Sequence, residues 1–330
     1  MRIVSVFLIV LVTFFFSACA SKEVFEPKNV VDDWDRYDNS GFTIEDMTHS
    51  AALVDDEKVL VRETVVDVTI KEDYKLLGYS DGWVLSSNID GNLTLNLVGD
   101  TAFENLNLKR TIASASVKDD ILAVLFTSNE MALYEISTKK LLLKEQGDAP
   151  IVVNSKIVEP IFKDNLVIFS TLDGKIVIMD VQEKKKLRTV IVSGEEYFNN
   201  VIYFNIVDNK IIASTGHKIL SLAKKEHRVK HDIRNVIDDG ETIYITTKQG
   251  EIISLTPDLQ QNNKVKFPFA HFLGLAISND KIYALEKEGY IIELSKDLME
   301  YSIYEVDIDD GYIFVSGKIF YVDDEYISVE

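Results

Sequence analysis

Residues 165–180 read Asn165-Leu-Val-Ile-Phe-Ser-Thr-Leu-Asp173-Gly174-Lys-Ile-Val-Ile-Met-Asp180, and this stretch decides the fold. Two runs rich in β-branched residues flank an Asp-Gly pair. Asp-Gly supplies the positive φ that a tight hairpin turn requires, and β-branched side chains favour the pleated conformation. The stretch therefore predicts a β-hairpin that turns at Gly174.

The same hairpin recurs along the chain. Further copies are Trp83–Leu97, Ile121–Ile136, Lys210–Leu222, Thr242–Leu255, Lys281–Leu294 and a shortened Tyr312–Val322. The turns at Gly91, Asn129, Gly174, Gly216, Gly250 and Gly289 are separated by 38, 45, 42, 34 and 39 residues. A period of about 40–45 residues is typical of the four-stranded blades of a β-propeller. The predicted fold class is all-β, a β-propeller of four-stranded blades.

The number of blades depends on how the two ends of the repeat are interpreted. Hairpin-like material at Lys58–Ile70 precedes the next copy by 27 residues, and the last copy follows its predecessor by 28. Two short end units look like halves of one blade, which favours seven blades and keeps eight as the alternative. We expect N-terminal strands to pair beside the C-terminal ones, because closure leaves no open sheet edge.

The N-terminus has the features of an export signal. One positive charge precedes an apolar run, Ile3–Phe16, which ends in Phe16-Ser17-Ala18-Cys19. About 14 apolar residues are too few to span a bilayer and suit a secretory signal. Small residues before a cysteine resemble the bacterial lipobox, and Cys19 is the only cysteine in the chain. We therefore expect cleavage after residue 18 and lipidation of Cys19, which anchors the protein to a membrane.

The expected organisation has three parts: a lipoprotein signal peptide over 1–18, the lipidated cysteine and a polar tether over 19–50, and the propeller over 51–330. Within the tether, one segment around Val30–Trp34 is expected to dock. Ala20 and Ser21 follow the cysteine where enteric inner-membrane lipoproteins carry aspartate, which favours the outer membrane and a periplasm-facing protein. No later apolar run is long enough to predict a transmembrane helix.

The charge balance limits the partners. Removing Arg2 with the signal leaves 34 basic against 54 acidic residues, a formal charge of −20. Nucleic-acid binding is not expected, because neutralising phosphates requires a basic surface. The expected partners are a membrane, in which the lipid anchors the protein, and a protein of the cell envelope. The propeller itself is expected to be monomeric.

The repeat unit at Asn165–Asp180 resembles the pyrroloquinoline-quinone-like propeller repeat, D-G-x-V-Y-V-x-[ST]-x-D-G-x-[LV]-x-A-L-D. It lacks the tryptophan that follows in that pattern, since only Trp34 and Trp83 occur in the chain, so aliphatic side chains must pack between the blades. A lipobox followed by such repeats resembles the BamB family of propeller lipoproteins. That resemblance implies assistance in outer-membrane β-barrel assembly, binding of a barrel-assembly component through loops on one face, and no catalytic site.

Acidic residues recur in phase with the repeat, just before the first strand of each hairpin. The candidate acidic interaction face consists of Asp55, Asp56, Asp119, Asp120, Asp164, Asp208, Asp238, Asp239, Asp309 and Asp310. These turns are expected on one face of the disc. One interpretation is that Asp is simply a favoured turn residue. The other is an acidic ring that meets a basic partner or divalent cations.

Catalytic chemistry finds little support in the residues. Quinoprotein dehydrogenases need a stacking tryptophan and usually a vicinal disulfide, which a single cysteine cannot form, so no cofactor is expected. His227 and His231 are spaced i, i+4 in a strongly charged segment and are expected on a solvated outer strand, not at a metal. His49, His217 and His271 show no motif.

Asp90-Gly91-Asn92-Leu93-Thr94 fits the acceptor pattern of bacterial periplasmic N-glycosylation, which makes Asn92 a possible glycosylation site. The leading hypothesis is a noncatalytic, membrane-tethered interaction module of the cell envelope. The alternatives are a propeller enzyme acting on envelope or extracellular glycans, and a surface-exposed ligand-binding or adhesin lipoprotein.

Overall fold

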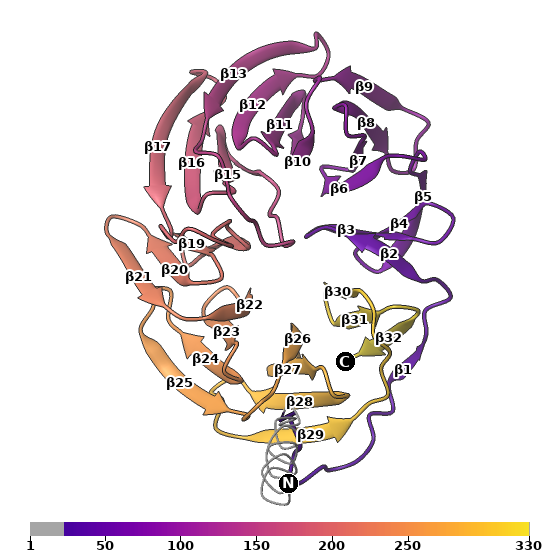
Figure 1. Ribbon diagram of the computed structural model, residues 1–330, viewed down its shortest axis with the longest axis vertical. Helices are drawn as coiled ribbons and strands as arrows, with labels where there is room; N and C mark the ends of the chain where they lie inside the picture. The colour runs from indigo at the N-terminus through magenta and orange to yellow at the C-terminus, as the bar shows by residue number, and fades with distance from the viewer. Residues whose placement is uncertain (1–22, 330) are drawn as a thin grey trace, which may run out of the picture.

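The computed structural model describes residues 23–329, so the predicted lipidation site at Cys19 lies outside the described residues. The described chain forms eight four-stranded antiparallel sheets arranged as blades around a central channel (Figure 1). The first four blades comprise β2 (Ile44–Met47), β3 (Ala51–Val54), β4 (Lys58–Val61) and β5 (Thr64–Thr69); β6 (Lys75–Ser80), β7 (Trp83–Ser87), β8 (Asn92–Leu97) and β9 (Phe103–Asn107); β10 (Ile112–Lys118), β11 (Ile121–Phe126), β12 (Glu130–Glu135) and β13 (Lys140–Gln146); and β14 (Ile161–Lys163), β15 (Leu166–Ser170), β16 (Lys175–Asp180) and β17 (Lys185–Ile191).

The other four comprise β18 (Tyr203–Val207), β19 (Lys210–Ser214), β20 (Lys218–Leu222) and β21 (Glu226–Lys230); β22 (Ile233–Asp238), β23 (Ile243–Thr247), β24 (Glu251–Leu255) and β25 (Gln261–Lys266); β26 (Phe272–Ser278), β27 (Lys281–Glu286), β28 (Tyr290–Ser295) and β29 (Tyr301–Glu305); and β30 (Ile313–Ser316), β31 (Ile319–Val322), β32 (Glu325–Ser328) and β1 (Tyr37–Asn39). The predicted fold class, a β-propeller of four-stranded blades, is confirmed.

The six turns that defined the repeat each join the second and third strands of a blade. Gly91 shows why glycine is needed there. Its φ is +79°, and a Cβ would lie 2.3 Å from the carbonyl oxygen of Arg110 on the neighbouring connection. Both the left-handed backbone and the close approach exclude a side chain. The turn chemistry visible in the sequence therefore matches the strand pairing.

The blade number is eight, so the favoured count of seven is wrong and the alternative is correct. The two short end units are parts of separate blades. Lys58–Ile70 contains β4 and β5, the third and fourth strands of the first blade, whose inner strands begin at Ile44. Tyr312–Val322 contains β30 and β31, the first two strands of the last blade. Both units looked incomplete because their missing strands have little repeat character in the sequence.

The ring is closed by the N-terminal segment, as expected. Strand β1 pairs antiparallel with β32, with Tyr37 opposite Ile327. Mixing strands from the two ends of the chain in one sheet ties the ring shut and removes an exposed edge. The propeller therefore begins before the expected boundary at residue 51, because β1 and β2 already belong to it.

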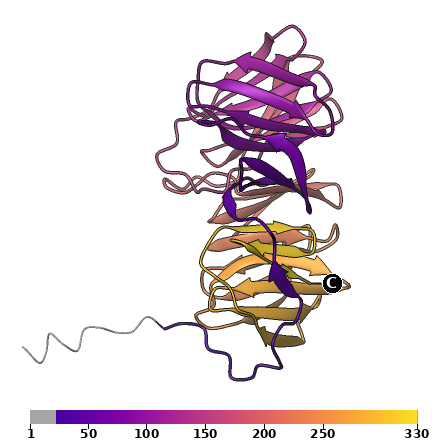
Figure 2. The same ribbon diagram turned by 90° about the vertical axis from the view of Figure 1, so that its right-hand side faces the viewer.

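The segment before β1 docks on the outside of the seventh blade (Figures 1 and 2). The amide of Trp34 donates to the Glu305 carbonyl at 2.6 Å, and that of Val31 donates to the Ile303 carbonyl at 2.8 Å. The Trp34 ring is buried and packs edge-on against Tyr283 and Tyr304. Docking around Val30–Trp34 is thus confirmed, and the region expected to be a free tether is largely attached from about Phe25 onward.

The core lies between adjacent blades and is mainly aliphatic. One cluster joins the second and third blades, with Leu85, Leu95, Leu122 and Val124 among its fully buried members. Aliphatic packing between blades therefore takes the place of the missing tryptophans, as the sequence predicted. Eight such layers hold the loops at both ends of the ring in fixed positions.

Candidate interaction face and central channel

The propeller has two faces that differ in their loops. We call the face with the connections between successive blades and the turns between second and third strands the connection face. The face with the remaining turns, between first and second and between third and fourth strands, is called the turn face. Successive turns of an antiparallel meander alternate between the two ends of the strands, which is why each face carries its own set.

The structure divides the candidate acidic residues between these faces. Asp119, Asp120, Asp164, Asp208 and Asp239 lie in turns between first and second strands, on the turn face, and Asp238 ends β22 beside them. Asp55 and Asp56 lie between β3 and β4, and Asp309 and Asp310 lie in the connection from β29 to β30, so these four are on the connection face. The expectation of a single acidic face is therefore wrong, because the two end units are offset in phase from the other copies.

Several of these carboxylates support their own turns. Asp120 accepts hydrogen bonds from the Ser137 amide at 2.8 Å and its hydroxyl at 2.6 Å. Asp239 accepts from the amides of Thr242 and Glu241 and lies 3.2 Å from the Lys296 ammonium. These contacts fit the interpretation of Asp as a turn residue. A role for the remaining carboxylate surface in binding stays a prediction.

An apolar patch occupies the connection face, on the two connections that precede and follow the fourth blade. It consists of Ile151 and Val152, from the β13–β14 connection, and Tyr197 and Phe198, from the β17–β18 connection, all exposed. The two connections are joined directly, because the Phe198 amide donates to the Val152 carbonyl at 2.9 Å. Clustered exposed apolar side chains on a soluble surface mark binding sites. We refer to these four residues as the apolar patch.

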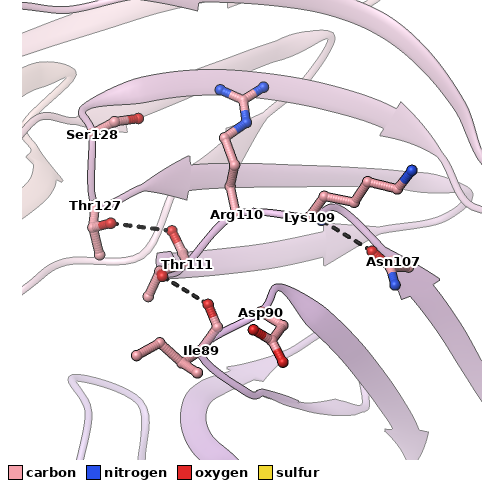
Figure 3. A pocket seen from close by; sticks show the side chains of 8 residues that line it. All are labelled: Ile89, Asp90, Asn107, Lys109, Arg110, Thr111, Thr127 and Ser128. Carbon is pink, nitrogen blue, oxygen red and sulfur yellow. Dashed lines mark hydrogen bonds between the residues drawn. The ribbon is translucent and has the colours of Figure 1, made fainter.

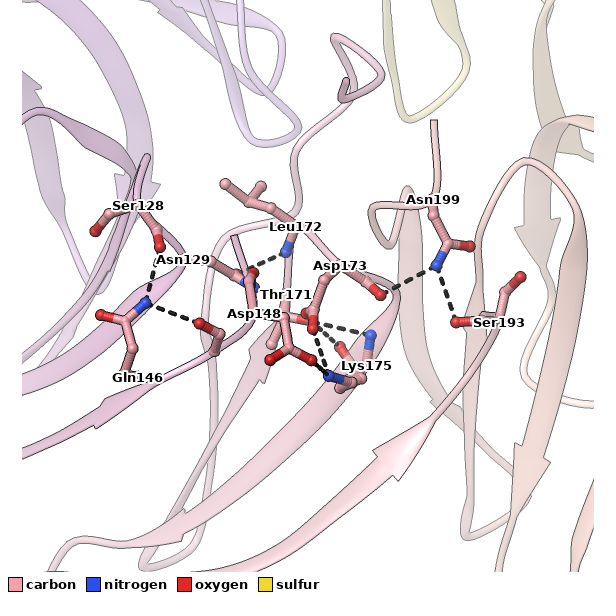
Figure 4. A network of polar contacts seen from close by, with 11 residues as sticks. Ser128, Asn129, Gln146, Asp148, Thr171, Leu172, Asp173, Lys175, Ser193 and Asn199 are labelled. Atoms are coloured by element: carbon pink, nitrogen blue, oxygen red, sulfur yellow. Dashed lines mark hydrogen bonds and ion pairs between the residues drawn. The ribbon is translucent and has the colours of Figure 1, made fainter. Parts of the chain in front are cut away.

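A polar network ties the two connections that carry the apolar patch to neighbouring turns (Figure 4). Asn129, fully buried in the β11–β12 turn, donates to the Asp148 carbonyl at 2.7 Å and accepts from the Leu172 amide at 2.9 Å. Asn199 donates to the carbonyls of Asp173 and Ser193. Asn129, from a turn of the third blade, and Asn199, from the β17–β18 connection, thus tie the two connections to a turn of the fourth blade.

Lys175 and Asp173 add charge to this network. The Lys175 ammonium lies 2.6 Å from Asp173 and 2.5 Å from Asp148. Burial raises the pKa of Asp173, but hydrogen bonds from Lys175, Thr171 and Asn129 outweigh burial and hold that pKa below its ordinary value. Asp173 is therefore ionised at neutral pH and keeps the loops of this network together.

A shallow groove of about 540 Å³ lies between the second and third blades on the same face (Figure 3). The Thr111 hydroxyl donates to the Ile89 carbonyl at 2.8 Å and closes one side. Arg110 pairs with Glu130 at 2.7 Å, so its charge is neutralised within the protein. Ile89 projects into solvent at the rim, where it extends the apolar surface around the channel mouth.

The central channel encloses a cavity of about 1080 Å³. Lys156 reaches into it from the β13–β14 connection and donates to the Arg234 carbonyl at 3.1 Å and to the Asn235 side-chain oxygen at 2.6 Å. Enclosure by the ring, together with the nearby Arg234 charge, lowers the pKa of Lys156 to about 8. Lys156 and Arg234 thus make one side of a largely apolar cavity cationic.

Carboxylates occupy other positions in the channel region and are hydrogen-bonded. Glu159 accepts from the Ser50 hydroxyl at 2.9 Å and lies 3.7 Å from His49 Nδ1. Asp238 accepts from the Tyr203 hydroxyl and, at 2.7 Å, from the Asn205 amide group. Burial, reinforced by Asp238, raises the pKa of Tyr203, so the phenol stays protonated. These carboxylates are paired and do not form a convergent couple.

Other predicted residues lie apart from these sites. His227 is exposed on β21, the outer strand of the fifth blade, as expected, and His231 follows that strand. Asn92 begins β8 and is half-buried beside Asn107, and its glycosylation stays a prediction. Between residues 23 and 329 no cluster of three or more His, Cys, Asp or Glu side chains is arranged to hold a metal. The same residues include no helix suited to crossing a bilayer.

Sequence reasoning missed the apolar patch, Lys156 and Arg234. The one available signal was the long β13–β14 connection, Gly147–Pro160, whose Ile-Val-Val run fits no hairpin. Nothing in the sequence brings Val152 beside Phe198 or Lys156 beside Arg234, since each pair meets only in the folded ring.

Comparison with known proteins gives one set of sequence relatives. The chain is 36% identical over 209 residues to the plasminogen-binding protein PgbB of Helicobacter pylori strain J99, and 35% identical to that of strain 26695. The match covers 62% of this chain but 39% and 38% of those proteins, so this chain spans about two fifths of their length. No family model matches the sequence.

Solved structures resemble the whole propeller. BamB from Moraxella catarrhalis superposes with a TM-score of 0.67 at 11% identity, covering 88% of this chain and 97% of that one. Sqt1 of Saccharomyces cerevisiae gives 0.59 at 11% identity, covering 92% and 98%. At such identities the likeness concerns the fold. The chain is a β-propeller of BamB-like architecture.

Proposed function

We propose that this protein is a noncatalytic, protein-binding propeller of the bacterial cell envelope, anchored through a lipid on Cys19. The observation that carries the proposal is the apolar patch on the connection face. Four exposed apolar side chains stand on two connections that a polar network holds in place, and clustered exposed apolar side chains mark binding surfaces. A rigid, preformed surface reduces the ordering cost of association.

The partner should carry an apolar centre with a basic rim. Glu195 and Glu196 precede Tyr197, and Asp148 lies near the start of the neighbouring connection, so acidic side chains border the apolar patch. The mature chain also has a formal charge of −20. Complementary charge around the rim would speed association more than it would tighten binding.

Plasminogen is the first partner to test, because the sequence relatives are named for binding it. Plasminogen binding would require a ligand-binding lipoprotein on the outer surface of the cell. A barrel-assembly component is the second candidate, supported by the BamB-like architecture, and it requires a periplasm-facing protein. Protease treatment of intact cells separates the two: cleavage favours the surface location, and protection favours the periplasm.

The binding test uses paired substitutions. Ile151→Asp and Phe198→Asp place a charge in the apolar patch, where Ile151 is 64% and Phe198 is 52% exposed. Ile191→Asp on β17 and Phe103→Asp on β9 are matched controls, with exposures of 53% and 61% on outer strands. Surface plasmon resonance against plasminogen should show at least about tenfold weaker binding for the patch variants, as expected for a central contact, and no change for the controls.

Equal effects of the patch and control variants would show that the patch is not the binding surface. If plasminogen does not bind at all, the same four variants are used in affinity purification from solubilised membranes. Loss of one envelope protein from the Ile151→Asp and Phe198→Asp samples, but not from the two controls, would then support the scaffold function, and unchanged recovery in every sample would reject it.

A further inference from the structure

Lys156 and Arg234 lie near each other in the central channel, and neither has an anionic partner among the described residues. Between residues 23 and 329, no carboxylate oxygen lies within 4.0 Å of the Lys156 ammonium or the Arg234 guanidinium. The mature chain carries 54 carboxylates and only 34 basic residues, so acidic partners are plentiful elsewhere in the ring. Two like charges held close together repel each other, so an anion bound between them would lower the electrostatic free energy of the pair.

The two cations are brought together by different parts of the chain. Lys156 comes from the β13–β14 connection, which enters the channel, and Arg234 comes from β22 on the sixth blade. The Lys156 ammonium is bonded to neutral oxygens of Arg234 and Asn235, and the Arg234 guanidinium contacts His271 Nε2. Arg234 Nε is buried and has no hydrogen-bond acceptor. The protein thus leaves one guanidinium donor without an acceptor.

Both cations can be reached from the cavity. Lys156 and Arg234 line the channel, and Lys156 keeps an exposed surface inside it although the ring surrounds it. Two nearby carboxylates do not pair with these cations: Asp238 is hydrogen-bonded to Tyr203 and Asn205, and Glu159 is hydrogen-bonded to Ser50. Asp238 lies four residues beyond Arg234 on the same strand, or about 13 Å away.

From these contacts we infer that the channel binds an anion, a carboxylate or phosphate group, between Lys156 and Arg234. The guanidinium supplies a planar donor edge and Lys156 a mobile point charge, a combination suited to either group. The cavity of about 1080 Å³ leaves room for a molecule larger than the anionic group itself. The site is separate from the apolar patch and does not depend on the function proposed for that patch.

Isothermal titration calorimetry on the full-length protein in detergent tests the site, with inorganic phosphate and citrate as separate probes. Binding of either is expected, and the stronger probe identifies the group preferred. Lys156→Met and Arg234→Met should each weaken binding about tenfold or more, as expected for loss of a charge-assisted hydrogen bond. Lys140→Met and Arg188→Met, on the outer strands β13 and β17, are the matched controls and should bind like the unchanged protein.

A pH series distinguishes a direct role of Lys156 from a structural one. With a pKa near 8, Lys156 is charged below that pH and neutral above it, so anion affinity should fall as pH rises from 7 to 9.5. Lys156→Arg keeps the charge over this range and should retain binding without that fall. Other charged or titratable groups at or near the cavity are Arg234, His271, Lys75, His49, Asp46, Asp73, Asp238 and Glu159.

Two results would overturn the inference. One is absence of heat for both probes in a folded protein, as judged by circular dichroism. The other is binding that Lys156→Met and Arg234→Met leave unchanged, since the anion would then occupy another surface. If a methionine variant fails to fold, Lys156→Arg and its pH profile decide the question.

Discussion

Replacing Asn129 tests whether the polar network that holds the connections of the apolar patch stabilises the propeller. The side chain is fully buried, donates to the Asp148 carbonyl and accepts from the Leu172 amide, and its φ is +63°. Asn129→Gly allows the same backbone conformation but leaves the Asp148 carbonyl and the Leu172 amide without their hydrogen-bond partner. Each buried polar group left unpaired lowers the unfolding free energy by roughly 1–3 kcal/mol, so the expected total loss is about 2–4 kcal/mol if both groups relax partly. Asn129→Ala adds the left-handed backbone cost of about 1–2 kcal/mol.

Guanidinium chloride unfolding followed by tryptophan fluorescence measures these differences, provided the slope against denaturant stays constant. Asn279 supplies the matched control. It has a φ of +46° on an exposed turn, so Asn279→Ala should lose only the backbone part, about 1–2 kcal/mol. If Asn129→Ala destabilises no more than Asn279→Ala, the two buried hydrogen bonds contribute nothing and the reasoning fails. Faster proteolysis within residues 147–160 of Asn129→Gly would locate the loss in the β13–β14 connection.

Three further outcomes are expected. Because the pKa of Asp173 is lowered, its ion pair stabilises the fold fully above pH 3.8, the ordinary pKa of the group, and this stabilisation is lost as pH falls through the lowered pKa. The difference in unfolding free energy between the unchanged protein and Asp173→Asn should therefore be constant at neutral pH and shrink below about pH 3.8. Trp34→Ala should lower the unfolding free energy measured in denaturant by about 3–5 kcal/mol, because the ring is buried. Trp34→Phe should retain most of this stability, because it loses only the 3.0 Å hydrogen bond from Nε1 to the Ser328 carbonyl. Equal losses in both variants would contradict a packing role. Cys19→Ser should abolish labelling with radioactive palmitate and move the protein from the membrane fraction to the soluble fraction, and retention in the membrane would contradict lipid anchoring.

Much of the fold could be predicted because it depends on local chemistry. Asp-Gly at Asp173-Gly174 and the equivalent turns set where strands reverse, and β-branched runs set which segments extend. Closure by N-terminal strands and docking near Trp34 also followed, since an open ring leaves an unpaired edge and a buried tryptophan needs a partner surface. The blade number did not follow, because β1, β2 and β3 have weak repeat character and their blades are completed by distant segments.

Much less of the candidate sites than of the fold could be predicted from the sequence. Acidic turns were visible at Asp119, Asp208 and Asp239, but their face depends on which strand of the blade they follow, and Asp55 and Asp309 fell on the other side. The contacts of Val152 with Phe198 and of Lys156 with Arg234 join segments more than 40 residues apart in the sequence. The sequence alone determined the hairpin period, the propeller and the predicted lipid anchor, since these rest on neighbouring residues. Only the closed ring decided the number of blades, the apolar patch and the cationic pair, because those come from segments that meet only after every blade has packed against the next.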